Sequence, residues 1–284
     1  MTNGLPAADN LCPYNEVPEA REEERKAMTC EFLKTSIEER VAWIEYQRPP
    51  LNAIDWKMLG EIPAALDAFL HDSGVRVIVF ASALEKYFST GADLRVLQAM
   101  GREDMRKWVE TCHSLVRQMR RAQKPLLAAI AGTAVGGGLE IVLHCDVRFA
   151  AESAQLGQPE INIAFIPPVG TTQSLPRLLG RPRALRFLYE GTLVSAEEAR
   201  GMGLVDFVVP PERLREEVQA YGAALARKSA EALAAIRRCI TTGLEMPYED
   251  ALAVELEAAV HLAGTPDFSE GLRAFFEKRR PKWE

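Results

Sequence analysis

The chain has 284 residues, 34 basic and 40 acidic side chains and a formal net charge of −6, and 48% of its residues are hydrophobic. This composition is that of an ordinary globular protein with one or two domains. Because a non-specific nucleic-acid binder needs a basic surplus to neutralise phosphates, the acidic balance argues against nucleic acid as a partner. The longest apolar stretches, residues 75–81 and 126–131, are far shorter than the roughly 20 residues that cross a bilayer, which argues against a membrane span.

Residues 1–27 are rich in acidic side chains and lack the apolar centre of a signal peptide, so we expect either a disordered extension before Met28 or an artefact of the choice of start residue. The five cysteines form no C-x-x-C pair and have no histidine at metal-ligand spacing. We therefore expect reduced thiols in a cytoplasmic protein and no metal site. The cysteines are Cys12, Cys30, Cys112, Cys145 and Cys239.

Strand-like and helical segments alternate along most of the chain, which favours an α/β fold. After about Pro211 the pattern becomes purely helical, and we expect these helices to pack on a neighbouring subunit or on their own core. In chain order we predict a strand at 41–46, a helix at about 55–71, a strand at 75–80, a helix at 103–121, a strand at 126–130, a helix at 139–144, a strand at 146–150, helices at 171–180, 182–190 and 195–201, a strand at 204–209, and helices at 212–243 and 248–262.

Two prolines and one aspartate set the expected boundaries near the start of the chain. Pro49 and Pro50 should end the first strand, because proline cannot continue a hydrogen-bonded ladder. Asp55 can cap the helix that follows, and Pro63 should kink that helix or divide it in two.

The run Gly136-Gly137-Gly138 between a buried strand and a helix is the most informative local feature. It fits neither the P-loop nor the dinucleotide fingerprint, because no lysine follows it and residue 134 is alanine. Backbone N–H groups at such a helix start can hold a negative oxygen, although tight packing of strand against helix explains the glycines equally well.

Three further residues attract attention, each with a structural alternative. Asp93 follows a second turn after a buried strand and can be a helix cap. Glu140 lies in the first turn after the glycines, where any carboxylate is favoured by the helix dipole. Glu160 lies at a turn, where a solvated charge is common.

A series of short segments runs in order along the chain. They are Phe88-Ser89-Thr90-Gly91-Ala92-Asp93-Leu94, Ala134-Val135-Gly136-Gly137-Gly138-Leu139-Glu140, Cys145-Asp146, Phe149-Ala150, Gly157-Gln158-Pro159-Glu160-Ile161, Ala184, Gly203-Leu204-Val205 and the tail 268–279. Together these segments resemble the enoyl-CoA hydratase (crotonase) superfamily, and the resemblance covers about residue 29 to the end of the chain.

The resemblance implies a spiral of ββα repeats followed by a helical trimerisation region. We accordingly expect a core with the acyl-CoA site at residues 28–211, a helical region at 212–284, and a homotrimer or a hexamer made of two trimers. The substrate is then a coenzyme A thioester, coenzyme A being part of the substrate, and no cofactor or metal is implied.

The resemblance also implies roles for particular residues. The thioester carbonyl would lie between the backbone amides of Ala92 and Gly137, which stabilise the negative oxygen that forms when a nucleophile adds to C3. Glu140 and Glu160 would share one water, one orienting it and the other delivering a proton to C2, and such a pair should titrate as a coupled unit with one raised pKa. The expected contacts to coenzyme A are Pro50, Leu51, Ser89, Asp93, Leu94, Arg95 and Lys278.

The chain departs from the family pattern after the second glutamate. Hydratases usually carry Ile-Pro-Gly-Ala-Gly-Gly-Thr-Gln there, whereas this chain has Ile166-Pro167-Pro168-Val169-Gly170-Thr171-Thr172-Gln173. Because Pro168 has no N–H, water positioning must differ or the pocket must serve another substrate. Together with residues 48–55, the Pro-Pro-Val segment is similar to alicyclic dienoyl-CoA hydratases of anaerobic aromatic degradation.

Several functions therefore stay open at the level of sequence. The first is reversible hydration of a 2-enoyl-CoA, as in fatty acid metabolism, with an alicyclic dienoyl-CoA as an alternative substrate. The second is double-bond isomerisation, which needs a base and the backbone amides but no held water. The third is an RNA-binding or scaffold protein of this fold, which predicts a clustered basic helix and assigns no role to Glu140 and Glu160.

His113 and His144 fit no catalytic triad, and we expect them inside helices as packing residues.

Overall fold

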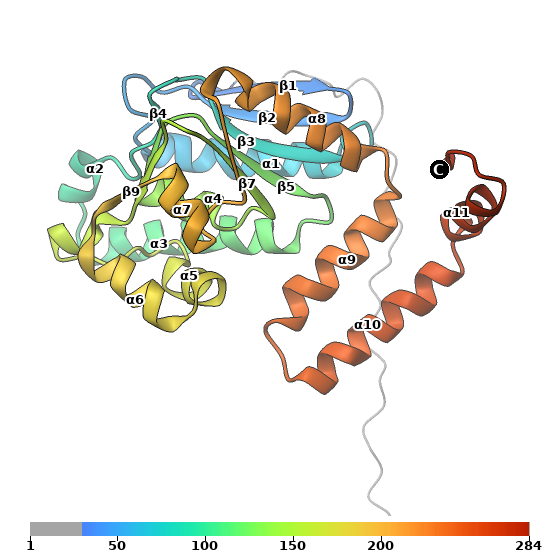
Figure 1. Cartoon of the computed structure of the whole chain (residues 1–284). Helices are drawn as coiled ribbons and strands as arrows, with labels where there is room; N and C mark the ends of the chain where they lie inside the picture. Colours follow the sequence, from blue (N-terminus) through green and yellow to red (C-terminus); the bar gives the residue numbers. More distant parts are fainter. Residues whose placement is uncertain (1–29, 284) are drawn as a thin grey trace, which may run out of the picture.

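A computed structural model gives the structure of residues 30–283, and a six-stranded sheet is its main feature (Figure 1). The predictions for residues 1–27 and Cys12 lie outside the described residues. In the strand order β1-β2-β3-β5-β7-β10, only β1 is antiparallel to its neighbour. The strands are β1 (Leu33–Glu38), β2 (Val41–Tyr46), β3 (Val77–Ser82), β5 (Leu126–Ile130), β7 (Val147–Ala151) and β10 (Phe207–Val209).

A second sheet of four short strands lies beside the first, in the order β4-β6-β8-β9. Its strands are β4 (Tyr87–Ser89), β6 (Thr133–Val135), β8 (Gln155–Gly157) and β9 (Leu193–Ser195). The consecutive pairs β3/β4, β5/β6 and β7/β8 each place one strand in the large sheet and the next in the small sheet. This repetition corresponds to the spiral of ββα repeats that the family resemblance implies.

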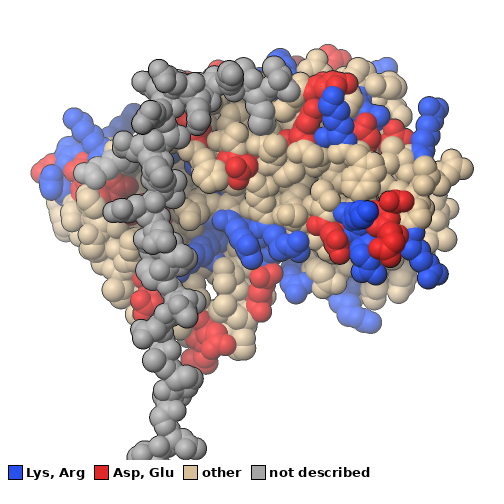
Figure 2. All heavy atoms as spheres, turned by 180° about the vertical axis from the view of Figure 1, so that it is seen from behind, with Lys and Arg blue, Asp and Glu red and all other residues tan. Residues whose placement is uncertain are grey.

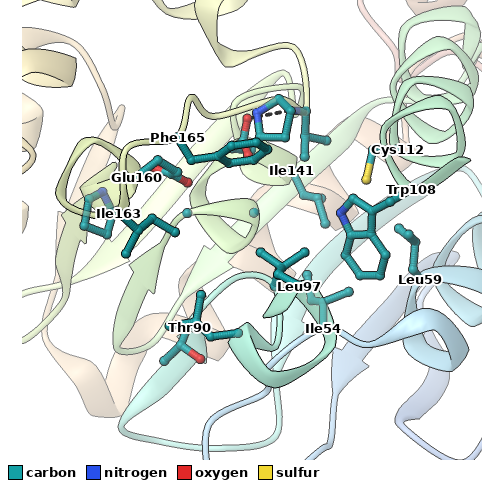
Figure 3. Close-up of a pocket in the computed structure, with 18 of the residues that line it drawn as sticks. Ile54, Leu59, Thr90, Leu97, Trp108, Cys112, Ile141, Glu160, Ile163 and Phe165 are labelled. Carbon is teal, nitrogen blue, oxygen red and sulfur yellow. Dashed lines mark hydrogen bonds between the residues drawn. The ribbon is translucent and has the colours of Figure 1, made fainter. Parts of the chain in front are cut away.

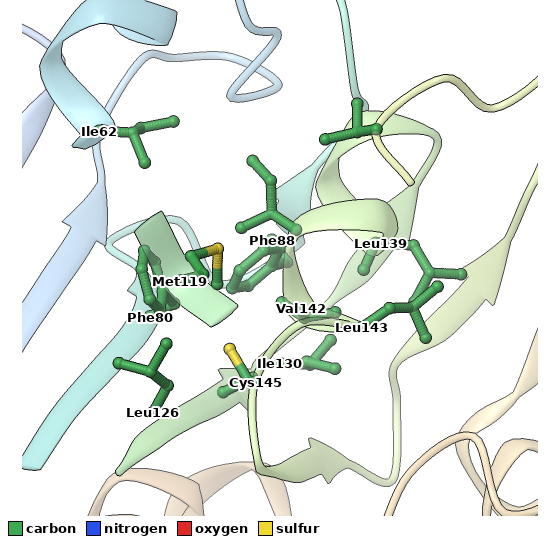
Figure 4. Close-up of a cluster of buried hydrophobic side chains, with 14 of the residues drawn as sticks. Ile62, Phe80, Phe88, Met119, Leu126, Ile130, Leu139, Val142, Leu143 and Cys145 are labelled. Carbon is green, nitrogen blue, oxygen red and sulfur yellow. The ribbon is translucent and has the colours of Figure 1, made fainter. Parts of the chain in front are cut away.

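Helices cover both faces of the large sheet, which explains why its central strands are apolar on both sides. Trp43 and Val79 belong to the core cluster under α8 (Leu214–Ala226). Ile44 and Phe80, the next residues along the same strands, belong to the cluster under α1 (Trp56–His71) and α3 (Arg102–Arg121). Figure 4 shows the centre of the second cluster, where Phe80, Phe88 and Met119 lie close together.

The other helices are short segments around the small sheet and a helical arm at the C-terminus. In Figure 1, α9, α10 and α11 extend away from the sheets, whereas α8 lies over the large sheet. The predicted domain boundary at residue 211 stays a prediction. The remaining helices are α2 (Leu94–Gln98), α4 (Gly137–Val142), α5 (Thr171–Leu179), α6 (Arg181–Glu190), α7 (Ala196–Met202), α9 (Ala230–Gly243), α10 (Tyr248–Ala263) and α11 (Pro266–Phe276), with 3₁₀ turns at Pro159–Ile163 and Pro211–Arg213.

The structure corrects several predicted elements. The helix at 55–71 is not divided at Pro63, because α1 buries Met58, Ile62 and Leu66 and this packing outweighs the one lost hydrogen bond. The strand predicted at 204–209 is reduced to β10, because residues 203–205 form the turn that ends α7. The helix predicted at 212–243 is two helices, and Ser229 caps the second of them.

The face of the molecule seen in Figure 2 carries basic and acidic side chains together, separated by wide uncharged areas. Within residues 30–283, no helix is both long enough and apolar enough to cross a membrane.

An ion pair attaches the helical arm to the α/β core. The Arg237 guanidinium on α9 donates to the Asp146 carboxylate at 2.8 Å and to the Met119 carbonyl at the end of α3 at 2.7 Å. The side chain of Arg237 is only 7% exposed. We expect Arg237→Met to lower the free energy of unfolding by about 3 kcal/mol, because it leaves a partly buried carboxylate unpaired.

Urea denaturation measures this loss, with Arg186→Met as the matched control. Arg186 forms an exposed ion pair with Glu190 on α6, and its loss should change the free energy of unfolding little, because exposed ion pairs contribute little to stability. If the two substitutions changed the free energy of unfolding equally, the buried ion pair would not stabilise the attachment of the arm.

Candidate active site

Two glycine-containing loops, one after β4 and one after β6, approach each other so closely that side chains are excluded. A Cβ at Gly91, where φ is +79°, would lie 2.8 Å from the Gly137 nitrogen. A Cβ at Gly138 would lie 2.7 Å from the Ser89 carbonyl oxygen. The glycines of both loops are therefore needed for the backbones to meet.

The contact brings together the two predicted backbone donors. Ile54 N–H donates to the Gly91 carbonyl at 2.7 Å and Asp93 N–H to the Ile54 carbonyl at 2.8 Å. The Ala92 N–H belongs to the same peptide unit as the Gly91 carbonyl and points to the opposite side, away from Ile54. Gly137 is the first residue of α4, where an N–H has no acceptor within the helix. Both residues line one cavity.

The two predicted glutamates line the same cavity. Glu140, on α4, is 1% exposed, and its Oε2 accepts a hydrogen bond from the Val169 N–H at 2.7 Å. Glu160 lies in the 3₁₀ turn after β8. With the Gln158 amide nitrogen assigned to the side facing Glu160, it donates to both carboxylate oxygens at 3.0 and 3.1 Å.

Burial shifts both carboxyl groups toward neutrality. It raises the pKa of Glu140 to about 8, with a further contribution from the charge of Glu160. It also raises the pKa of Glu160 to about 7. Near neutral pH the pair can therefore hold one proton between the two groups, so that it offers both an acid and a base.

These raised pKa values predict how stability depends on pH. The folded protein holds the two protons more tightly than the unfolded chain, whose glutamates titrate near 4.5, so the free energy of unfolding falls as pH rises from about 5 to 8. Glu140→Gln should remove part of this fall and be more stable than the wild type at pH 8 by about 2 to 4 kcal/mol.

Urea denaturation at pH 5.5 and pH 8 measures the difference. If the free energies of unfolding of the variant and the wild type differ by the same amount at both pH values, burial does not hold the carboxyl group of Glu140 neutral.

Apart from the carboxyl groups, the cavity wall is mainly apolar, and its volume is about 280 Å³. In Figure 3, Glu160 and Ile163 lie on one side of the cavity, and Trp108, Cys112 and Leu59 lie on the other. Such a wall suits a hydrocarbon group. Apolar wall residues not singled out from the sequence include Ile54, Leu59, Leu97, Trp108, Leu115, Ile141, Ile163 and Phe165.

Pro168 and Val169 also line the cavity, and two histidines hold their carbonyl groups. His113, on α3, contacts the Pro168 oxygen through Nε2 at 2.8 Å, and His144 contacts the Val169 oxygen at 2.9 Å. His144 lies just after α4, so the expectation that it lies inside a helix is wrong. The local sequence around the two histidines does not indicate that their side chains form these hydrogen bonds.

Three of the residues expected to contact coenzyme A lie in or beside the loop after β4. Ser89 is fully buried, and its hydroxyl donates to the Asn52 carbonyl and accepts from the Gly91 N–H. Asp93 caps α2 and forms an ion pair with Arg48 at 3.3 Å. Leu94 is 60% exposed and lines the cavity. Ser89 and Asp93 thus hold the loop in place, and their contacts with coenzyme A stay predictions.

The other four expected contacts are spread more widely. Leu51 is exposed, and its carbonyl accepts from the Thr90 N–H at 3.2 Å, which places the Pro50–Leu51 turn beside the same loop. Arg95 is exposed on α2. Lys278 follows α11, which lies at the opposite side of the molecule from α2 in Figure 1. One chain alone does not bring Lys278 to the cavity.

The described residues contain no group of three or more histidine, cysteine, aspartate or glutamate side chains that could hold a metal ion. Their four cysteines are free thiols. The chemical groups of the cavity are two carboxyl groups, backbone amides, the polar side chains of Thr90, Cys112 and Asn162, and an apolar wall. This combination defines a class of site that can hold a carbonyl compound and move protons beside it.

The sequence profile of the enoyl-CoA hydratase/isomerase family matches residues 36–284, and the chain belongs to this family. It is 34% identical over 254 residues to a probable enoyl-CoA hydratase of Bacillus subtilis, covering 89% of this chain and 98% of that protein. It is also 34% identical to a crotonyl-CoA hydratase of Syntrophomonas wolfei, with the same coverage.

Solved structures agree with the sequence relatives. An enoyl-CoA hydratase from Bacillus anthracis superimposes with a TM-score of 0.86 at 35% identity, covering 89% of this chain and 99% of that one. An enoyl-CoA hydratase from Mycobacterium smegmatis gives a TM-score of 0.84 at 30% identity, covering 89% and 98%. The predicted crotonase fold is confirmed.

Proposed function

We propose that the chain is an enoyl-CoA hydratase that adds water reversibly across the 2,3 double bond of an enoyl-CoA thioester. The observation that carries this proposal is the placement of two carboxyl groups, the buried Glu140 and the partly buried Glu160, in one mainly apolar cavity with the amides of Ala92 and Gly137. The family relatives named as enoyl-CoA hydratases support the same reaction.

The proposed reaction uses the amides and the glutamates in sequence. The thioester oxygen accepts hydrogen bonds from the Ala92 and Gly137 N–H groups. The water oxygen bonds to C3 while the ionised carboxylate of the pair takes a proton from it, and the electrons of the double bond move to the thioester oxygen as an enolate. The enolate then collapses as C2 takes the proton of the other carboxyl group. The amides bind the enolate more strongly than the ground state, which accelerates the reaction.

The paired carboxyl groups favour hydration over double-bond isomerisation. Moving a double bond needs one group that takes and returns a proton, whereas hydration needs a base for water and an acid for C2. Raised pKa values on both Glu140 and Glu160 supply the two roles at neutral pH. Isomerisation remains the second candidate because Pro168 removes one N–H beside the site.

Product analysis by mass distinguishes these functions. Purified protein is incubated with crotonyl-CoA and, separately, with a cyclic dienoyl-CoA. A product heavier by one water establishes a hydratase and selects a linear or an alicyclic substrate. A shifted alkene of unchanged mass would establish the isomerase, and no product from any enoyl thioester would favour a binding protein.

The proposal includes a homotrimer or a hexamer and a cytoplasmic location. Exposed apolar side chains on the helical arm support self-association, because such patches commonly mark interfaces. Leu256, Val260, Phe275 and Phe276 are each at least 60% exposed. Association of the arms offers a route by which Lys278 could serve the site of a neighbouring subunit.

A further inference from the structure

A single peptide group lies between His113 and Glu140. The Pro168 carbonyl and the Val169 N–H belong to the same planar peptide unit and point to opposite sides of it. The carbonyl faces His113 Nε2 at 2.8 Å, and the N–H donates to Glu140 Oε2 at 2.7 Å. The result is a continuous chain of hydrogen bonds from the imidazole through the peptide to the carboxyl group.

The hydrogen-bond partner of His113 determines which ring nitrogen carries a proton. A carbonyl oxygen only accepts hydrogen bonds, so Nε2 of His113 must carry a proton. By donating to the Pro168 oxygen, the imidazole polarises the peptide and strengthens the hydrogen bond from its N–H to Glu140. A stronger donor stabilises the ionised form of Glu140 and opposes the effect of burial on its pKa.

A second histidine fixes the following peptide unit. His144 Nε2 lies 2.9 Å from the Val169 carbonyl oxygen. A Cβ at Gly170, where φ is +82°, would lie 3.1 Å from the same nitrogen, so the loop packs directly on this ring. His144 therefore limits movement of the loop, whereas His113 is joined to the Pro168–Val169 peptide, whose N–H donates to Glu140.

We propose that His113 is a positioning residue, which holds the Pro168–Val169 peptide so that its N–H is aimed at the Glu140 carboxyl group. That this carboxyl group is catalytic rests on the proposed function, whereas the hydrogen-bonded chain does not. Pro168 offers no N–H, and the peptide that follows it presents a donor to Glu140, whose carboxyl group also interacts with the backbone and side chain of Thr171.

The first test measures the pKa of Glu140, by ¹³C NMR of glutamate labelled at the side-chain carboxyl, with the signal assigned through Glu140→Gln. His113→Phe removes the donor and should raise the pKa of Glu140 by about half a unit or more. His113→Gln retains a side-chain N–H and should restore the wild-type value. His71→Phe is the matched control, because His71 is exposed on α1 and does not line the cavity.

The second test measures the kinetics of hydration. His113→Phe should lower kcat about tenfold with little change in KM, and His113→Gln should retain at least half of kcat. An unchanged pKa and kcat in His113→Phe would overturn the proposal, as would an equal loss in His113→Gln, which would indicate packing alone. If His113→Phe does not fold, His113→Leu takes its place.

The two tests separate this proposal from the proposed function. A wild-type protein that hydrates no thioester, together with a raised pKa of Glu140 in His113→Phe, would reject the hydratase and keep the positioning role. Activity that is lost in Glu140→Gln but unchanged in His113→Phe would keep the hydratase and reject the positioning role.

Discussion

Replacing Glu140 or Glu160 with glutamine should lower kcat for the proposed hydration by about 10³-fold or more, with little change in KM. Glutamine keeps the shape of the side chain and removes its ability to take or give a proton, and positioned proton transfer contributes about 10² to 10⁴ to rate. In the proposed reaction the two carboxyl groups act on one water, so the double variant should be only slightly slower than either single variant. Steady-state kinetics with crotonyl-CoA measures all three.

The matched control is Glu190→Gln, since Glu190 lies on α6 in an exposed ion pair with Arg186. Its kcat should equal that of the wild type. If Glu140→Gln or Glu160→Gln retained more than about a tenth of wild-type kcat, that carboxyl group would not transfer a proton in the slow step.

Replacing Gly91 with alanine should have the second largest effect. The new methyl group would lie 2.8 Å from the Gly137 nitrogen and 3.0 Å from the Val135 carbonyl, at a φ of +79°. The loops must then separate, which misplaces the Ala92 and Gly137 amides relative to each other. Since losing one such donor costs about 10² to 10³ in kcat, we expect a fall of at least that size.

The control for this variant is Gly60→Ala on α1, where a Cβ meets nothing within 4 Å. It should leave kcat unchanged and stabilise the helix by about 0.5 to 1 kcal/mol. Because Gly91→Ala also strains the backbone, circular dichroism and thermal denaturation must accompany the kinetics. A folded Gly91→Ala with wild-type kcat would show that the contact between the loops does not set the donor geometry.

Local patterns predicted most of the α/β core. The apolar runs at 41–46, 75–80 and 126–130 correspond to β2, β3 and β5, since strands covered by helices on both faces are apolar throughout. The strand β1 was missed because its LKTSIE sequence is largely polar, and an edge strand buries little of its surface. Pro63 does not divide α1, because the buried face of the helix decides its continuity.

The candidate site was predictable where it depends on backbone geometry. Gly91 and Gly138 stand where the close approach of the two loops admits no Cβ, and this requirement leaves a clear sequence signal. By contrast, the bond from His113 to the Pro168 carbonyl joins residues 55 positions apart, and no local pattern encodes it. The same holds for Ser89, whose hydroxyl holds the loop by bonding to the carbonyl of Asn52.

The measurement that tests the central claim most directly is hydration of crotonyl-CoA in water labelled with ¹⁸O, followed by mass spectrometry of the product. The account predicts a 3-hydroxyacyl-CoA that carries one labelled oxygen at C3, formed by the wild type and by Glu190→Gln but not by Glu140→Gln or Glu160→Gln. Failure of the wild type to incorporate label from any enoyl-CoA, or equal incorporation by the glutamine variants of the pair, would contradict the claim that these two glutamates add water to an enoyl thioester.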